Sequence, residues 1–177
     1  MLSQYSLQNE DFLDYQLFNY TKSAKLNKRR RKSWILFSVC FLLFAVSAHL
    51  RSNEIQALLF LILCLICILF YPKYIKWRYK KHYLNFIKDN YQARIGKTES
   101  LDFQEKIIHS KSATGEGKIY LTEIENIYEI PRIFIMSIKS GMSIIIPKKY
   151  ISDLNQLKKK FTDLKLKVDE NLDWKWK

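Results

Sequence analysis

The sequence predicts an α+β membrane protein, in which a transmembrane pair of helices carries an antiparallel β-domain with a C-terminal helix. Two apolar runs, residues 34–50 and 55–71, contain no Asp, Glu, Lys or Arg. Residues alternating in polarity follow from Leu101, and helical spacing returns after Ser152. The predicted segments are an N-terminal helix and basic segment (1–33), a transmembrane hairpin (34–71), a juxtamembrane helix (72–97) and a β-domain (98–177).

The net charge of +13 is concentrated in the first part of the chain. Residues 1–97 hold 16 Lys or Arg against 5 acids, whereas residues 98–177 hold 14 against 12. A nucleic-acid-binding domain usually spreads its basic side chains over a folded face. The distribution therefore predicts no nucleic-acid partner.

The N-terminal segment is expected to be an amphipathic helix starting at Asn9, a suitable N-cap residue. Leu13, Leu17 and Tyr20 repeat at helical spacing and form one apolar stripe. The stripe could lie among lipid headgroups or pack on the β-domain. Acids in the first turns favour packing on protein.

The two apolar runs have 17 residues each, or about 26 Å of helix, slightly less than the roughly 30 Å hydrocarbon core. Snorkelling lysine and arginine side chains can cover the difference. A buried hairpin of a soluble protein would keep one polar face, and residues 55–71 have none apart from Gln56. A cleavable signal ending near Ala48 is the other alternative; the long preceding region and the second run speak against it.

Positive charge flanks the hairpin at both open ends, with seven cations in residues 22–32 and five in 73–81. The positive-inside rule then places both termini in the cytoplasm and makes this a multi-pass inner-membrane protein. Anionic lipid headgroups are therefore one predicted partner. The predicted membrane-surface residues are Lys28, Arg29, Arg30, Arg31, Lys32, Lys73, Lys76, Arg78, Lys80 and Lys81, with Trp34, Tyr71 and Trp77 as interfacial aromatics.

The segment after the second run is aromatic and basic together, with Tyr79, Tyr83 and Phe86 at helical spacing. Such interleaving can stack on single-stranded nucleic acid. Directly after a membrane span, a helix that leaves the bilayer with its lysines among headgroups is the simpler interpretation.

The β-domain is expected to be an antiparallel meander with a hairpin at Ser140-Gly141. A helix capped by Ser152 should follow, with Lys158 to Lys160 mostly facing outward. The tail could add an edge strand. Trp174 and Trp176 either plug the open end of the domain or dip into the membrane interface. The apolar face of the helix is predicted to consist of Leu154, Leu157, Phe161 and Leu164.

No motif predicts catalytic, cofactor-binding or metal-ligating residues. Cys64 and Cys67 form a CxxC pair inside an apolar run, where helix packing is the expected role. The TGEGK at residues 114–118 lacks the spacing of a phosphate-binding loop. The acids Glu116, Glu123, Glu125 and Glu129 are expected on a solvated face or in contact with Lys148 and Lys149.

Several segments, in this order, resemble the YcxB-like family of bacterial membrane proteins: YQLFNYTKS, RYKKHY, GEGKIYLTEIENIYEI, SIIIPKKYI and DWKWK. The resemblance implies a small cytoplasmic β-domain similar in outline to pleckstrin-homology-like folds. It implies no catalytic residues.

The expected function is therefore non-enzymatic. The cytoplasmic domain would bind a protein partner or the lipid surface, as an adaptor, a regulator, an assembly subunit or an immunity-like protein. The alternative is a membrane-bound enzyme that acts on lipid or nucleotide. No cofactor is expected, and the sequence is compatible with a homo-oligomer.

Overall fold

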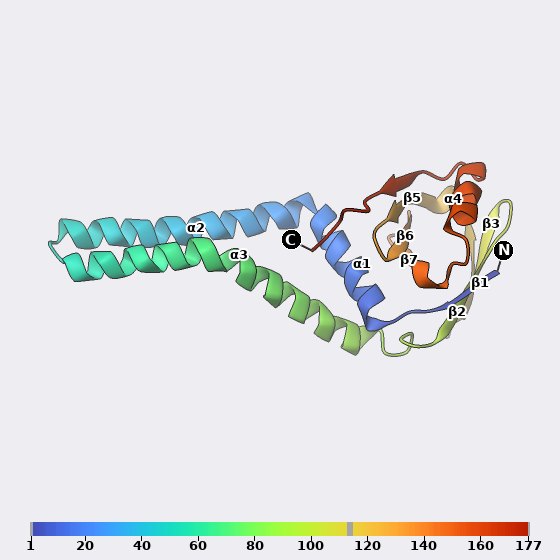
Figure 1. Cartoon of the computed structure of the whole chain (residues 1–177), viewed down its shortest axis with the longest axis horizontal. Coiled ribbons are helices and arrows are strands. Elements are labelled where there is room, and N and C mark those ends of the chain that lie inside the picture. Colours follow the sequence, from blue (N-terminus) through green and yellow to red (C-terminus); the bar gives the residue numbers. More distant parts are fainter. Residues whose placement is uncertain (1, 113–114, 177) are drawn as a thin grey trace. The chain divides into compact units, whose positions relative to one another are not determined.

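A computed structural model of the chain describes residues 2–112 and 115–176 (Figure 1). The TGEGK segment at residues 114–118 therefore falls partly outside the described residues. Contacts divide the chain into two compact units. The helical unit comprises residues 17–82, and the β unit combines residues 2–16 with residues 83–176.

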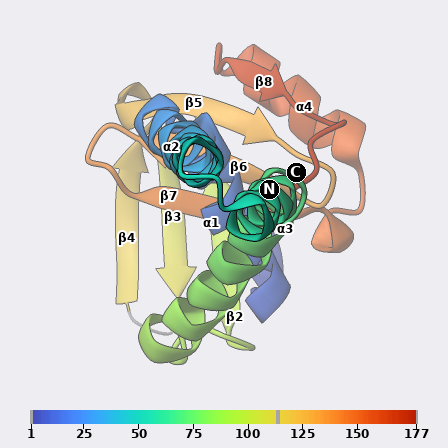
Figure 2. The same cartoon turned by 90° about the vertical axis from the view of Figure 1, so that its left-hand side faces the viewer.

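The helical unit is dominated by α2 (Ala24–Leu50) and α3 (Glu54–Asn90), which run side by side in opposite directions (Figures 1 and 2). Small side chains are buried, and Cys64 Sγ lies 3.4 Å from the carbonyl oxygen of Ser38 across the helix pair. Small residues allow two helix backbones to approach closely. This places Cys64 in helix packing, as its apolar context predicts. The buried small residues are Ala45, Ala48, Ala57 and Cys64.

Both helices extend beyond the apolar runs that predicted them. α2 starts after Ser23, whose hydroxyl accepts a hydrogen bond from the Leu26 backbone N–H, so the basic segment is helical. α3 continues through Pro72 to Asn90. The predicted juxtamembrane helix over residues 72–97 is helical over residues 72–90, where it continues α3, whereas residues 91–97 are not helical. Proline removes one backbone donor, and here the surrounding turns keep the helix intact.

The β unit contains two four-stranded sheets, where the sequence predicted one meander. Figure 2 shows β3 and β4 of the first sheet lying side by side. All neighbouring strands are antiparallel except β5 and β8, which are parallel. The first sheet has the order β1 (Leu2–Ser6), β2 (Thr98–Phe103), β3 (Ile107–Ser112), β4 (Gly115–Tyr120), and the second β7 (Ser143–Pro147), β6 (Ile133–Ile138), β5 (Ile124–Glu129), β8 (Val168–Glu170).

The predicted hairpin at Ser140-Gly141 is confirmed, since β6 and β7 pair across it. Gly141 has a φ of 86°, which glycine adopts at little cost. The predicted edge strand in the tail is β8.

The first strand of the sheet, β1, was not predicted. It pairs with β2 from Leu2 opposite Asp102 to Ser6 opposite Thr98. Tyr5 and the following Leu7 are buried. The β unit therefore reaches beyond the predicted boundary at residue 98 and includes the start of α1 (Asn9–Lys22).

Helix α4 (Leu154–Asp163) packs on the β unit, with Leu157 and Phe161 buried. Two details correct the prediction. The N-cap is Asp153 and not Ser152, because the Asp153 carboxylate accepts a hydrogen bond from the Gln156 backbone N–H at 3.0 Å. Leu154 is exposed, since it lies in the first turn before the buried face begins.

The ring of Phe161 joins the two sheets. Its centroid is 5.8 Å from that of Phe103 in β2 and 5.8 Å from that of Phe134 in β6. Edge-on aromatic contacts of this kind add to the stabilisation from burial.

Candidate functional site

The outer surface of α2 and α3 is apolar and uncovered. Their most apolar 18-residue windows have mean hydropathies of 2.0 and 2.6, and only 11% of each window is buried. Soluble monomeric proteins rarely expose a continuous apolar surface of this kind. Both helices are long and apolar enough to cross a membrane.

A pocket of about 390 Å³ lies where the basic part of α2 meets its apolar part, and we call it the basic pocket. Four of its residues come from α2, and each of the first two pairs with later ones at a spacing of three or four, which places all four on one helix face. Three more come from α3, namely Pro72 and one residue on either side of it. The lining residues are Asn27, Arg30, Arg31, Trp34, Tyr71, Pro72 and Lys76.

The electrostatics of the basic pocket favour an anion. Its lining includes the cations Arg30, Arg31 and Lys76 and no acid. α2 contains no Asp or Glu, and the two acids of α3, Glu54 and Asp89, lie near its ends and do not line the pocket. The indole Nε1 of Trp34 is shielded from solvent and has no hydrogen-bond partner within the described residues.

The predicted surface cations are distributed over different places. Arg30, Arg31 and Lys76 line the basic pocket with the predicted aromatics Trp34 and Tyr71. The others lie outside it. Arg29 and Lys32 line a separate groove of about 530 Å³, Lys81 stands 5.2 Å from the ring centre of Trp77, and Lys28, Lys73, Arg78 and Lys80 are exposed.

Sequence reasoning missed Asn27 and Pro72 as members of the pocket. The spacing from Asn27 to Trp34 is visible in the sequence and could have identified the α2 face. The pairing of that face with Pro72 depends on the register between two helices, which the sequence does not specify.

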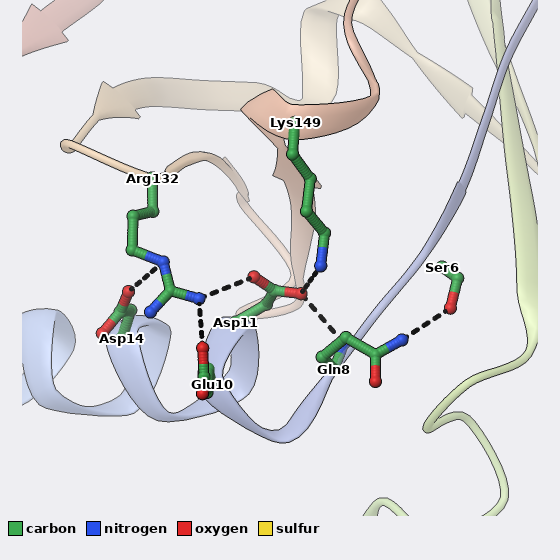
Figure 3. A network of polar contacts seen from close by, with 7 residues as sticks. All are labelled: Ser6, Gln8, Glu10, Asp11, Asp14, Arg132 and Lys149. Atoms are coloured by element: carbon green, nitrogen blue, oxygen red, sulfur yellow. Dashed lines mark hydrogen bonds and ion pairs between the residues drawn. The ribbon is translucent and has the colours of Figure 1, made fainter.

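The β unit holds a charged cluster around Arg132, drawn in Figure 3. Its guanidinium group lies 2.7 Å from Glu10, 3.6 Å from Asp14 and 3.7 Å from Asp11. The ammonium of Lys149 lies 3.7 Å from the other oxygen of Asp11. The first turns of α1 thus pack on the β unit through their acids, as their position favoured.

Asp11 is the buried member of this cluster, with a side chain only 2% exposed. The same oxygen that faces Lys149 accepts a hydrogen bond at 2.9 Å from the backbone N–H of Gln8. This bond satisfies one of the free donors at the start of α1. The cluster therefore stabilises the packing of the first turns of α1 on the β unit and has a structural role.

A second ionic cluster surrounds Glu129, whose side chain is 3% exposed. One carboxylate oxygen is 2.7 Å from the ammonium of Lys148, and the other is 2.6 Å from that of Lys158. The predicted contact between these glutamates and Lys148 is confirmed for Glu129. The expectation that Lys158 to Lys160 mostly face outward is wrong for two of the three, because Lys160 donates to the carbonyl oxygen of Phe103.

The pKa of Glu129 reflects two opposing effects. Burial raises it, while hydrogen bonds and positive charge from Lys148 and Lys158 lower it by more, so that the pKa falls below its ordinary value. The carboxylate is therefore held ionised as part of the fold.

A third concave surface lies on the outer face of the first sheet and has a volume of about 370 Å³. Asp102 and His109 face each other on neighbouring strands there, next to Ser100. None of its lining side chains is buried. Within residues 2–112 and 115–176, no group of three His, Cys, Asp or Glu side chains is arranged to hold a metal ion.

These features define an α+β protein with two long apolar helices and two mainly antiparallel sheets. Residues 103–161 match the model of the family described as YcxB-like protein. The match runs from the end of β2 through most of α4 and confirms the predicted resemblance over that segment. No curated protein and no solved structure shows detectable similarity to the chain.

Proposed function

We propose that the chain is an integral inner-membrane protein in which α2 and α3 cross the bilayer. The observation that carries this proposal is the apolar surface of the two helices, of which only 11% is buried in each window. Lipid chains would cover that surface at no cost in hydrogen bonding, because helices satisfy their backbone groups internally.

Both termini lie in the cytoplasm in this proposal. The cations of residues 22–32 and 73–81 lie at the open end of the hairpin, whereas the connecting loop pairs His49 with Glu54 at 3.0 Å. Retention of positive charge on the cytoplasmic side supports this orientation.

Cysteine accessibility tests the topology. The three native cysteines are replaced by alanine, and single cysteines are introduced as Ser52→Cys in the loop and Ser140→Cys in the β6–β7 turn. A membrane-impermeant maleimide should label Ser52→Cys in intact cells and should label Ser140→Cys only after the membrane is opened. The reversed pattern would refute the orientation, and a full-length chain stable in water without detergent would refute membrane insertion.

The β unit is proposed to bind a protein partner without catalysis, as an adaptor, a regulator, an assembly subunit or an immunity-like protein. Its nearly balanced charge supports a protein over a bare lipid surface. It also exposes large apolar side chains, with Tyr120 59% and Met142 64% exposed. The arrangement of two sheets and α4 is compatible with a pleckstrin-homology-like outline, which the resemblance implies.

Site-specific crosslinking in native membranes tests this second part. A photoreactive amino acid at Tyr120 or Met142 should yield one discrete crosslinked protein, whereas the same group at the exposed polar Gln104 should not. Crosslinks to phospholipid from all three positions would instead assign the domain to the lipid surface.

The enzymatic alternative would use the outer face of the first sheet, where His109 lies opposite Asp102. The exposure of that surface weighs against it, because catalytic groups usually need partial removal from water. Turnover of a lipid or nucleotide by the purified protein, lost in His109→Gln, would establish the alternative.

A further inference from the structure

We infer that the basic pocket binds the phosphate group of an anionic phospholipid. The inference rests on the proposed function, because it needs α2 and α3 in a bilayer. It goes beyond a general attraction between cations and headgroups, since it assigns the lipid to one face of α2 and the facing turns of α3.

The charge of the pocket defines the ligand as an anion. Arg30, Arg31 and Lys76 converge on one cavity from two helices, and no lining residue is acidic. Guanidinium groups hold phosphate oxygens through paired, charge-assisted hydrogen bonds, and the lysine adds a further point charge. Basic pockets between helices on the cytoplasmic side are suited to phospholipid headgroups.

The indole of Trp34 supplies a second, independent observation. Its N–H is shielded from solvent and lacks a hydrogen-bond partner among the described residues. Buried indole N–H groups usually have an acceptor, and an unsatisfied donor costs free energy. An ester or phosphate oxygen of a lipid headgroup is an acceptor of the required kind.

The apolar side of the pocket distinguishes a lipid from a free phosphate ion. Trp34, Tyr71 and Pro72 are among its lining residues, and the ring of Tyr71 lies 5.8 Å from that of Phe37, one turn beyond Trp34 along α2. Large apolar side chains beyond this point are exposed, among them Leu36 and Phe70. A headgroup in the pocket can therefore continue into acyl chains along the helices.

The test measures lipid binding to the purified full-length protein in detergent by native mass spectrometry. Phosphatidylglycerol and phosphatidylcholine are the two probes. We expect wild-type protein to retain phosphatidylglycerol preferentially. Arg30→Gln/Arg31→Gln should weaken its affinity about tenfold or more, because each charge-assisted hydrogen bond contributes on that scale.

The matched control is Lys28→Gln/Arg29→Gln, which removes the same charge from the same helix outside the pocket. Its affinity should stay within about twofold of wild type, as exposed charges contribute little. Equal losses in the two double variants would overturn the pocket in favour of diffuse attraction.

Trp34→Phe isolates the indole N–H, since it keeps an aromatic ring in place. It should lower phosphatidylglycerol affinity about two- to tenfold, the range of one neutral hydrogen bond. Trp77→Phe is the control, because Trp77 is 59% exposed and outside the pocket. An unchanged affinity of Trp34→Phe for phosphatidylglycerol would show that the indole N–H does not bind the lipid.

Competition with inorganic phosphate separates the two sources of the anion. Millimolar phosphate should leave bound phosphatidylglycerol in place, and displacement at that level would assign the pocket to a soluble ion instead. A failure of the proposed function can be told apart from a failure of this inference. If the chain does not span a membrane, the purified protein will stay soluble without detergent. A detergent-dependent chain without headgroup preference would overturn the inference alone.

Discussion

The ammonium nitrogen of Lys158 lies 2.6 Å from Oε2 of Glu129, which joins α4 to β5 across the β unit. Lys148 in the short turn after β7 binds the other carboxylate oxygen. Removal of this carboxylate would leave the largely buried ammonium group of Lys148 without its counter-charge, and breaking a buried ion pair in this way is strongly destabilising.

Glu129→Gln should destabilise the β unit by about 3 kcal/mol, since it leaves Lys148 buried without its counter-charge. The free energy of unfolding of the full-length protein in detergent, measured with urea, checks this. Glu125→Gln in the exposed part of the same strand should change stability by less than about 0.5 kcal/mol. Equal effects of the two changes would mean that the ion pairs contribute nothing.

Stability should also depend on pH through Glu129. Its pKa in the folded protein is lowered from 4.5, so the stabilisation is complete above that value and is lost as the pH falls through the lowered pKa. We expect wild type to lose unfolding free energy more steeply than Glu129→Gln as the pH falls below 4.5. Parallel pH profiles for the two proteins would contradict this assignment.

Asp11 and Glu10 should differ in importance although both contact Arg132. Asp11→Ala removes a buried acceptor from Gln8 and should cost about 1–3 kcal/mol. Glu10 is 71% exposed, so Glu10→Ala should cost about 0.2–1 kcal/mol. Urea unfolding of the two variants under identical conditions compares them, and the reverse order would refute a structural role for the buried carboxylate.

Truncation of a buried side chain next to β1 should lower the free energy of unfolding as much as truncation in the core of the β unit. Leu7 follows β1 and is fully buried, so Leu7→Ala should lower the free energy of unfolding by about 2–5 kcal/mol. Gln4→Ala on the exposed side of β1 is the control and should be nearly neutral. A neutral Leu7→Ala would show that the strand detaches without loss to the rest of the unit.

Removal of charge from the basic segment should disturb insertion. Replacement of residues 28–32 by uncharged glutamine and asparagine should weaken or invert the topology reported by Ser52→Cys labelling. Lys158 and Lys160 are unsuitable as controls because they hold the β unit together. A better control changes five exposed lysines of the β unit to glutamine, and it should leave the labelling pattern unchanged: Lys106, Lys118, Lys139, Lys159 and Lys175.

The sequence specified the long helices and the β6–β7 hairpin because their signals are local. Continuous apolar runs predicted α2 and α3, and Gly141 marked the turn. β1 was not predicted because its five residues, LSQYS, contain few apolar positions. Its stability comes from pairing with β2, nearly a hundred residues away in the chain, and such contacts leave no local pattern.

The residues of the basic pocket could also be predicted only in part. The cations and aromatics at the helix ends were identifiable by composition. Which of them meet in one pocket was not, because Arg30 and Lys76 come together only through the register of α2 against α3. The sequence around Glu129 likewise does not distinguish it from a surface glutamate. Its burial and its ion pair with Lys158 depend on the packing of α4.

The pairing of Ser3 with Leu101 fixes an order of events during synthesis. A ribosome that adds 5–20 residues per second needs roughly 5–20 s to pass from one partner to the other. Throughout that interval β1 lacks its neighbouring strand, while both long helices are synthesised. β1 and β2 can therefore pair only after both long helices have been synthesised, because β2 follows them in the chain.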